Sequence, residues 1–208
     1  LRSDELPPEV TDPAITESRQ GAVEAYHGLI EQFRRAFGGQ DLDAQASVAA
    51  IGGLLGDELQ LGYGELGYDS DPVDARSMIE GVRDGGPTLT TYSKLQRVRG
   101  QASQAIGLLV RFAPDERALA GHAYALQAYA EIFLAELFCS GIPLSTVDFE
   151  GDYTFRPGST TAGVYAHALA LLDTAMTLVG DSTRFVHLAR MARARVFLDL
   201  GELDEAAA

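Results

Sequence analysis

Apolar residues recur at intervals of three and four along most of this chain, and this spacing constrains the fold more than any other feature. In residues 17–37 the recurring side chains are Val23, Tyr26, Leu29, Ile30, Phe33 and Phe37. Such intervals match the 3.6-residue turn of an α-helix and place the side chains on one face. The same spacing predicts helices over residues 43–55, 72–82, 90–112, 114–138, 160–179 and 183–200. No segment shows the two-residue period of a strand, so the sequence predicts an all-α fold.

Glycine, proline and capping residues mark where the predicted helices begin and end. Gly38 and Gly39 end the first helix, and Asp43 is the expected N-cap of the second. Pro114 fits the first turn of the helix that runs to Phe138, because a proline there loses no helical hydrogen bond. The apolar residues of that helix cover more than one stripe, so we expect it to be the most buried helix.

Three segments lack this periodicity. Residues 60–72, which hold four Gly or Pro residues and two tyrosines, are predicted to form a loop. Residues 1–16, which include three prolines, are predicted to form an extended arm. Residues 139–158 are predicted to form a long loop, after which Ser159 or Thr160 caps the next helix. We therefore expect an extended arm over residues 1–16, followed by one α-helical domain over residues 17–208.

Charge and cysteine content narrow the classes of function. The chain has 16 Lys and Arg against 30 Asp and Glu, which gives a formal net charge of −14. Such a surface repels the phosphates of nucleic acids and of anionic lipids, so we expect neither as a partner. Cys139 is the only cysteine, which excludes an internal disulfide, and we expect it to be a buried structural thiol. No stretch approaches the roughly 20 apolar residues needed to span a bilayer.

The end of the chain, residues 190–207, predicts a helix, a turn at Gly201 and the start of a second helix. Ala194, Phe197, Gly201 and Ala206 follow one another along this segment. Their spacing resembles a tetratricopeptide hairpin, in which small residues let two helices approach and an aromatic ring fills the gap. A repeat hairpin buries its apolar face only against neighbouring repeats. Because the chain stops at Ala208, we expect the last hairpin to be incomplete and the chain to be truncated at its C-terminus.

Three further blocks occur in a characteristic order. Residues 92–106 read Tyr-Ser-Lys-Leu-Gln-Arg-Val-Arg-Gly-Gln-Ala-Ser-Gln-Ala-Ile, a helix led by a tyrosine. Residues 117–144 hold a long Ala- and aromatic-rich helix that ends in the turn Gly141-Ile142-Pro143-Leu144. Residues 159–175 hold a third helix, with Ser159-Thr160-Thr161, Val164-Tyr165, Leu172-Asp173 and Ala175. The order and spacing of these blocks, with the repeat hairpin behind them, resemble the SusD/RagB family.

The resemblance implies a bacterial outer-membrane lipoprotein with a right-handed superhelical scaffold of tetratricopeptide-like hairpins. Proteins of that family bind glycans or peptides at the cell surface, catalyse no reaction, and act with a TonB-dependent outer-membrane β-barrel transporter. They are considerably longer than this chain, which would form the N-terminal part of one. Contact with the membrane would be only through a lipid anchor upstream of Leu1.

A second class of function stays open. The chain could be a tetratricopeptide-like scaffold that mediates protein–protein assembly through a concave face, without a nutrient ligand. A signal peptide that ends in a lipid-acceptor cysteine just upstream of Leu1 would favour the capture lipoprotein. A start methionine at that place would favour the scaffold.

Four aromatic residues lie in segments predicted to be loops, where a helical core does not need them. They are Tyr63, Tyr68, Tyr153 and Phe155. Aromatic rings can stack on a neutral polar ligand while nearby carboxylates accept its hydroxyl protons. The four are therefore the candidate ligand-binding residues. The alternative is that their rings fold back onto the helices.

The sequence offers no pattern typical of a catalytic or metal site. The four histidines include no i, i+4 pair, and each is expected to pack at a helix edge or to face water. Two acidic loops could offer oxygens to a hard cation such as calcium, although a solvated loop explains both. The residues are His27, His122, His167 and His187, and in the loops Asp69, Asp71 and Glu80, and Asp148, Glu150 and Asp152. We expect a protein that is not an enzyme and needs no cofactor.

Overall fold

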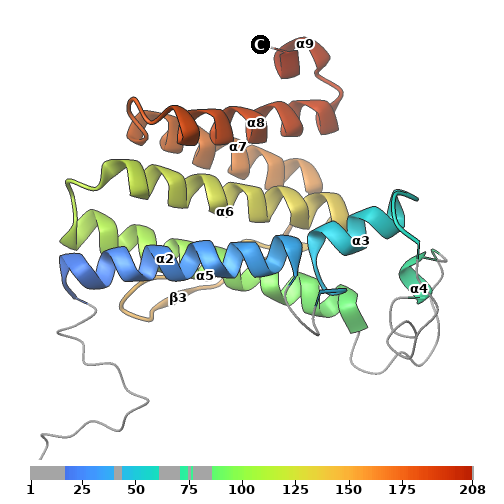
Figure 1. Cartoon of the computed structure of the whole chain (residues 1–208), viewed down its shortest axis with the longest axis horizontal. Helices are drawn as coiled ribbons and strands as arrows, with labels where there is room; N and C mark the ends of the chain where they lie inside the picture. Colours follow the sequence, from blue (N-terminus) through green and yellow to red (C-terminus); the bar gives the residue numbers. More distant parts are fainter. Residues whose placement is uncertain (1–16, 40–43, 61–70, 75, 77–85, 208) are drawn as a thin grey trace, which may run out of the picture.

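The computed structural model describes residues 17–39, 44–60, 71–74, 76 and 86–207, and this part of the chain is mostly α-helical (Figure 1). The predicted all-α class is confirmed. The long helices are α2 (Arg19–Gly38), α5 (Gly86–Phe112), α6 (Arg117–Phe138), α7 (Thr161–Leu178) and α8 (Thr183–Leu200). The shorter ones are α3 (Val48–Leu55), α4 (Asp71–Asp74) and α9 (Leu203–Ala207). The predicted arm over residues 1–16 lies outside the described residues.

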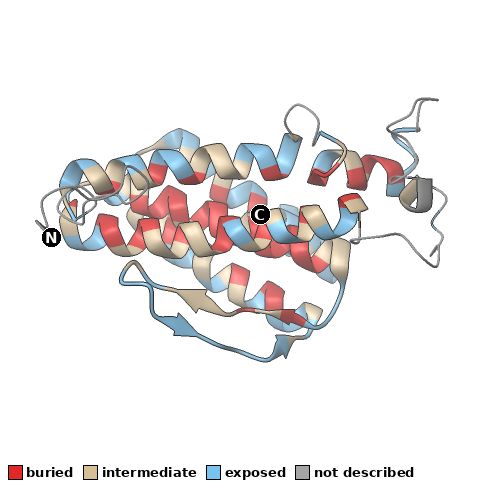
Figure 2. Ribbon diagram, turned by 90° about the horizontal axis from the view of Figure 1, so that it is seen from below, coloured by how far each residue is buried: buried red, intermediate tan, exposed pale blue. Residues whose placement is uncertain are grey.

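Helix α6 lies at the centre of the molecule, between α2 and α5 on one side and α7 and α8 on the other (Figure 1). Fourteen of its 22 residues are buried, more than in any other described helix, which confirms the prediction for this segment. Many of them are alanines, which let neighbouring helices approach closely. Figure 2 shows the buried residues concentrated along this central line. Any side chain that α6 presents to its neighbours therefore lies in the core.

Several predicted helix ends shift by a few residues. Helix α3 begins at Val48, and Ser47 caps it by accepting a hydrogen bond from the amide of Ala50 at 3.2 Å. The prediction that Asp43 caps this helix is wrong, because Ser47 is its N-cap, and Asp43 lies outside the described residues. Helix α6 begins at Arg117, so Pro114 lies in the preceding turn and not in the first helical turn. In both places the helix begins a few residues after the residue that was predicted to start it, and a turn precedes the helix.

Other boundaries agree with the sequence or extend it. Gly38 is the last residue of α2, Thr160 caps α7 through the amide of Gly163, and α8 spans Thr183–Leu200 as predicted. Helix α5 begins at Gly86, earlier than expected, with Pro87 in the first turn. Of the helix predicted over residues 72–82, the structure describes only the short α4 and Arg76.

The segment predicted to be a loop, residues 139–158, contains paired strands. Strand β1 (Ile142–Pro143) pairs antiparallel with β4 (Gly158–Ser159), and β2 (Thr146–Val147) pairs with β3 (Tyr153–Thr154). The two ladders share one turn, and we call residues 142–159 the β-hairpin. Strands of two residues are too short to show a period in the sequence, which is why the prediction failed here.

Short connections join α7 to α8 and α8 to α9 at the C-terminal edge (Figure 1). Gly201 ends α8 in the left-handed region, with φ 77°, where a residue with a Cβ would be strained. The predicted turn at this glycine is therefore confirmed. No helix in the described part of the chain is long and apolar enough to cross a membrane.

Candidate functional site

The β-hairpin is shaped by the side chain of Asp148. Its Oδ1 accepts hydrogen bonds from the amides of Glu150 at 3.0 Å and Asp152 at 2.9 Å, so the side chain closes the turn. Ser145 ties the two arms together farther down, because its hydroxyl accepts from the amide of Arg156 at 3.0 Å. These local bonds fix the direction of the outer arm. Figure 2 shows the β-hairpin as a ribbon along one side of the helices.

The outer arm presents two aromatic rings to solvent. Tyr153 is 68% exposed and Phe155 is 83% exposed, and their ring centroids lie 6.0 Å apart with an interplanar angle of 14°. Alternate residues of an extended arm share one face, which explains why the rings stack on each other. We call Tyr153 and Phe155 the aromatic pair. The alternative that these rings fold back onto the helices is wrong for both of them.

The other two candidate aromatics, Tyr63 and Tyr68, lie outside the described residues. The structure therefore brings together two of the four candidate ligand-binding residues and describes no position for the others. An exposed parallel pair of rings offers a flat apolar surface of the kind that stacks on a sugar ring or on another planar group.

The turn of the β-hairpin is anchored on helix α5 by Phe149. Its ring packs edge-on against Phe112, with centroids 6.2 Å apart, and Arg111 lies 5.8 Å from the centre of the Phe149 ring. A Cβ at Gly107 would lie 2.7 Å from Phe149, so only a glycine lets the ring approach the helix this closely. Phe149 points inward while the aromatic pair points outward. The β-hairpin is therefore held against the helices by a different ring from those it exposes.

A buried ionic network fixes the base of the β-hairpin. Arg99 of α5 donates through Nε to Glu131 of α6 at 2.9 Å, and the two side chains are 3% and 0% exposed. His167 of α7 places Nδ1 2.6 Å from the second oxygen of Glu131. We call Arg99, Glu131 and His167 the buried triad after its buried pair, Arg99 and Glu131, whereas His167 is partly exposed. Each member comes from a different helix, so the triad joins α5, α6 and α7.

The guanidinium of Arg99 also reaches the backbone of the β-hairpin. Its Nη1 lies 3.3 Å from the carbonyl oxygens of Pro143 and of Ser145, and 2.8 Å from the side-chain oxygen of Gln96. A planar guanidinium with five N–H donors suits such a branching set of acceptors. Arg99 thus links the core of the helices to the strand that begins the β-hairpin.

The buried triad is not among the residues predicted from the sequence. Arg99 directly follows Val98 on the apolar face of its helix, and Glu131 lies within the helix that has the most buried residues among those described. A charged residue at a core position needs a partner, because an unpaired buried charge is strongly unfavourable. That signal was available in the sequence. It could have marked Arg99 and Glu131 as a pair, but it could not have selected His167.

His167 is 42% exposed, and a buried carboxylate orients its ring. Such a pair occurs in catalytic sites, where the histidine also contacts a nucleophile. Among the described residues, no serine, threonine or cysteine side chain forms a hydrogen bond with His167. The arrangement supports a positioning role for the triad, namely holding the β-hairpin.

A second histidine corrects the expectation that all four lie at helix edges or in water. His122 of α6 is 6% exposed, its Nδ1 lies 2.8 Å from the hydroxyl of Tyr26, and its ring stacks on Phe185 at 4.2 Å. Burial, with a smaller contribution from the charge of Arg184, lowers the pKa of His122 to about 4. The ring is therefore neutral at pH 7 and can accept the hydrogen bond of Tyr26, whose pKa is raised by burial.

Cys139 also differs from its expected place. The thiol is exposed, and the residue caps the C-terminal end of α6 with φ 59°. The chain leaves the helical path at this residue, so the side chain no longer follows the buried face of α6. The prediction of a buried structural thiol is wrong.

The acidic residues of the β-hairpin turn gather at its tip. The carboxylate oxygens of Asp148, Glu150 and Asp152 lie within 4.8 Å of one another, and all three residues are exposed. They could offer oxygens to a hard cation. One oxygen of Asp148 already accepts the two amide bonds that close the turn, and this structural role accounts for that side chain. Asp69 and Glu80 of the other acidic loop lie outside the described residues.

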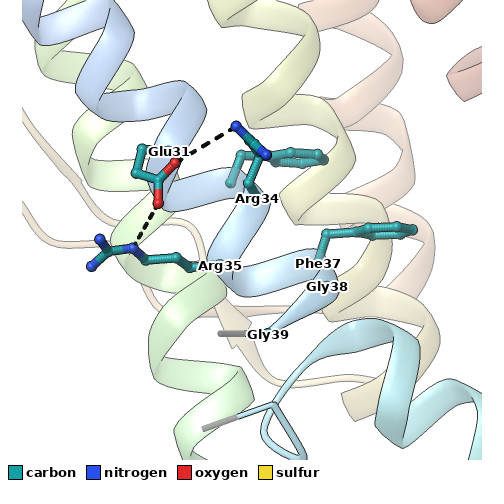
Figure 3. Close-up of a pocket in the computed structure, with 7 residues that line it drawn as sticks. Glu31, Arg34, Arg35, Phe37, Gly38 and Gly39 are labelled. Carbon is teal, nitrogen blue, oxygen red and sulfur yellow. Dashed lines mark hydrogen bonds and ion pairs between the residues drawn. The ribbon is translucent and has the colours of Figure 1, made fainter. Parts of the chain in front are cut away.

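A cavity of about 490 Å³ lies at the C-terminal end of α2 (Figure 3). Its charged residues are paired within the helix, because Glu31 lies 3.0 Å from Arg35 and 4.0 Å from Arg34. Its Phe37 ring points toward α6 and lies 5.6 Å from the ring of Phe133. These contacts belong to the packing of α2 on α6, so this cavity is a weaker candidate site than the aromatic pair.

No family model, no curated protein and no solved structure matches the chain.

Proposed function

We propose that this chain is the helical part of a non-catalytic capture protein of the SusD/RagB type, which holds a glycan or a peptide at the aromatic pair. The observation that carries the proposal is the exposed, stacked pair Tyr153 and Phe155 on a β-hairpin that the core holds in place. A rigid support favours affinity, because binding then costs the conformational entropy of the ligand but not that of the site.

The contacts between the three sequence blocks support the same proposal. Arg99 lies in the block over residues 92–106, Glu131 in the block over 117–144, and His167 in the block over 159–175. The buried triad joins these three side chains, and Arg99 also reaches the turn Gly141-Ile142-Pro143-Leu144 through the carbonyl of Pro143. Segments that resemble one family in order and spacing thus also form one packed unit around the base of the candidate site.

The charge of the site indicates the class of ligand. Asp148, Glu150 and Asp152 lie on the same β-hairpin as the aromatic pair, and the whole chain is acidic. Carboxylates accept hydrogen bonds from hydroxyl and amine groups and repel anions. A neutral glycan or a peptide without acidic residues fits this surface, whereas a phosphorylated or acidic ligand does not.

The proposal includes a partner and a location. In it, a lipid anchor upstream of Leu1 holds the protein at the outer surface of the bacterial outer membrane, and the ligand passes to a TonB-dependent β-barrel transporter. Extraction of native membranes with mild detergent should then recover the protein together with a large β-barrel. Recovery in the soluble fraction without such a partner would contradict this part of the proposal.

Ligand binding is tested by substitution of the two exposed rings. With a neutral oligosaccharide array and a pool of tryptic peptides as probes, Tyr153→Ala and Phe155→Ala should each weaken binding by about 1 kcal/mol, the scale of a lost aromatic contact. The melting temperature should not change, because neither ring is buried. Leu89→Ala removes a side chain that is 50% exposed on α5 and serves as the matched control. Wild-type affinity in both ring variants would exclude the aromatic pair as the site.

The alternative is a tetratricopeptide-like scaffold that assembles proteins without a nutrient ligand. One observation favours it, because Ala194, Phe197 and Ala206 line a common groove between α8 and α9, as the spacing of a repeat hairpin requires. A cytoplasmic location together with no binding to either probe would favour this scaffold over the capture protein.

A further inference from the structure

Exposed apolar side chains are concentrated at the C-terminal edge of the molecule. Met191 is 67% exposed, Leu198 57%, Leu200 41% and Leu203 65%, and together they make up four of the eleven large apolar residues exposed in the described part of the chain. They lie within a segment of thirteen residues on α8 and at the start of α9. In Figure 1 this edge lies at the top, and no described element covers it. We call it the α8–α9 face.

A groove of about 620 Å³ runs along this face between α7, α8 and α9. Both apolar and charged side chains line it. The apolar residues are Met176, Met191, Ala194, Phe197 and Ala206, and the charged ones are Asp173, Arg190, Arg193 and Glu205. An exposed groove that combines apolar and charged side chains is typical of a surface that another polypeptide covers.

The charge of this face differs from that of the rest of the chain. Helix α8 carries four arginines and a single aspartate, whereas Glu202, Asp204 and Glu205 follow it without a basic residue. Over residues 183–207 the formal charges cancel, although the whole chain has a net charge of −14. The basic residues therefore lie along the first part of this segment, and the acidic residues lie at the end of α8, in the turn and in α9.

Two of the four arginines have no acidic partner among the described residues. Arg193 pairs with Asp173, and Arg195 pairs with Glu136. Arg184 and Arg190 form no ion pair within the described part of the chain, and both are exposed. These two guanidinium groups are available to carboxylates from outside the molecule.

We propose that the α8–α9 face binds a second copy of this chain in a two-fold symmetric dimer. In such a dimer the same patch lies on both partners, so the patch must be complementary to itself. The antiparallel arrangement places the basic residues of one α8 against the acidic turn and α9 of the other copy. It also covers the groove and the exposed Met191 and Leu198. Two strongly acidic chains repel each other least where the local net charge of the surface is zero, and residues 183–207 at this face have a formal net charge of zero. The inference does not depend on the capture function.

The oligomeric state of the full chain tests the proposal. Sedimentation velocity over a dilution series should show a monomer–dimer equilibrium. The buffer must contain a reductant, because the exposed thiol of Cys139 could join two chains by a disulfide. A monomer at every concentration would overturn the proposal and would leave the face for a different protein.

Substitutions locate the interface. Met191→Glu and Leu198→Glu place a carboxylate in the apolar part of the face, and each should weaken the dimer at least about tenfold. Val110→Glu is the matched control, since Val110 is 60% exposed on α5, away from the face. The dimer affinity of Val110→Glu should fall only by the small amount that one added negative charge causes at any other place on the surface. Equal weakening by all three variants would contradict this interface. All three side chains are exposed in the monomer, so an unchanged melting temperature of the monomeric variants confirms that they fold.

Discussion

The interior formed by α5, α6 and α7 and the α8–α9 face distribute charged and apolar side chains in opposite ways. In the interior, Glu131 and Arg99 are almost completely buried. At the face, Met191 and Leu203 are about two-thirds exposed. Hydrophobicity alone would predict the reverse. The comparison teaches that at these positions the contacts with partners, and not residue type alone, decide burial.

The partners are easily named in the interior. Glu131 has both of its oxygens engaged, one by Arg99 and one by His167, and Gln127 adds a contact at 3.3 Å. These hydrogen bonds replace much of the stabilisation that the carboxylate loses when it leaves water. At the face, no described element supplies a partner for the apolar side chains. Stability should therefore be sensitive to the interior charges and insensitive to the exposed apolar residues.

The largest effect is expected when one member of the buried pair is removed. Glu131→Ala leaves Arg99 buried without its carboxylate, and it should lower the free energy of unfolding by about 3–5 kcal/mol. Urea denaturation followed by circular dichroism measures the loss. The double variant Arg99→Met with Glu131→Leu removes both charges and should be less damaging than Glu131→Ala alone. If the double variant is less stable than Glu131→Ala, the prediction is wrong. The ion pair would then contribute net stability of its own, beyond keeping each buried charge from being unpaired.

A second pair of variants makes the same chemical change in both regions. Leu134 of α6 is completely buried, so Leu134→Ala should cost about 2–5 kcal/mol through lost burial and a cavity. Leu198→Ala at the face should change the free energy of unfolding by no more than about 0.5 kcal/mol in the monomer. The comparison is made by urea denaturation at a concentration where the chain is monomeric. Similar losses at both positions would mean that Leu198 is covered within the monomer.

A pH dependence also arises in the interior. Burial lowers the pKa of His122 from 6.5 to about 4, so the folded state binds fewer protons than the unfolded state between these two values. The stabilisation is complete above pH 6.5 and is lost as the pH falls toward 4, by up to about 3 kcal/mol. Denaturation curves measured between pH 7 and pH 4 give the slope.

His122→Gln is the control for this titration. The glutamine amide can still accept a hydrogen bond from Tyr26 but does not titrate, so the pH dependence in this window should become shallower. A slope that is equally steep in wild type and His122→Gln would assign the pH dependence to other groups.

The positions of the helices could be predicted because they depend on neighbours in the sequence. The apolar spacing located the long helices, and capping residues such as Thr160 or turn residues such as Gly201 gave their ends within a few positions. Errors arose where two signals competed over a few residues, as at Asp43 and Ser47 before α3 and at Pro114 before α6. In each case a short turn precedes the helix, and the periodicity of the helix contains no information about that turn.

The candidate site was only partly predictable. Tyr153 and Phe155 were selected because aromatic rings in a non-helical segment do not serve a helical core. That they stack on each other follows from the strand pairing of the β-hairpin. The segment was predicted to be a loop, because two-residue strands carry no recognisable period. The buried triad was missed, although two charged residues at core positions of predicted helices gave a signal.

The sequence by itself determined the helical class, the order of the helices and the acidic character of the surface. The tertiary structure decided which charged residues lie inside, where the β-hairpin sits and which apolar residues stay outside. The physical reason is the distance along the chain between the partners. A helical period or a cap is set by residues three or four positions apart, whereas Arg99 meets Glu131 across 32 residues and Glu131 meets His167 across 36. Only the packing of three helices brings these side chains together.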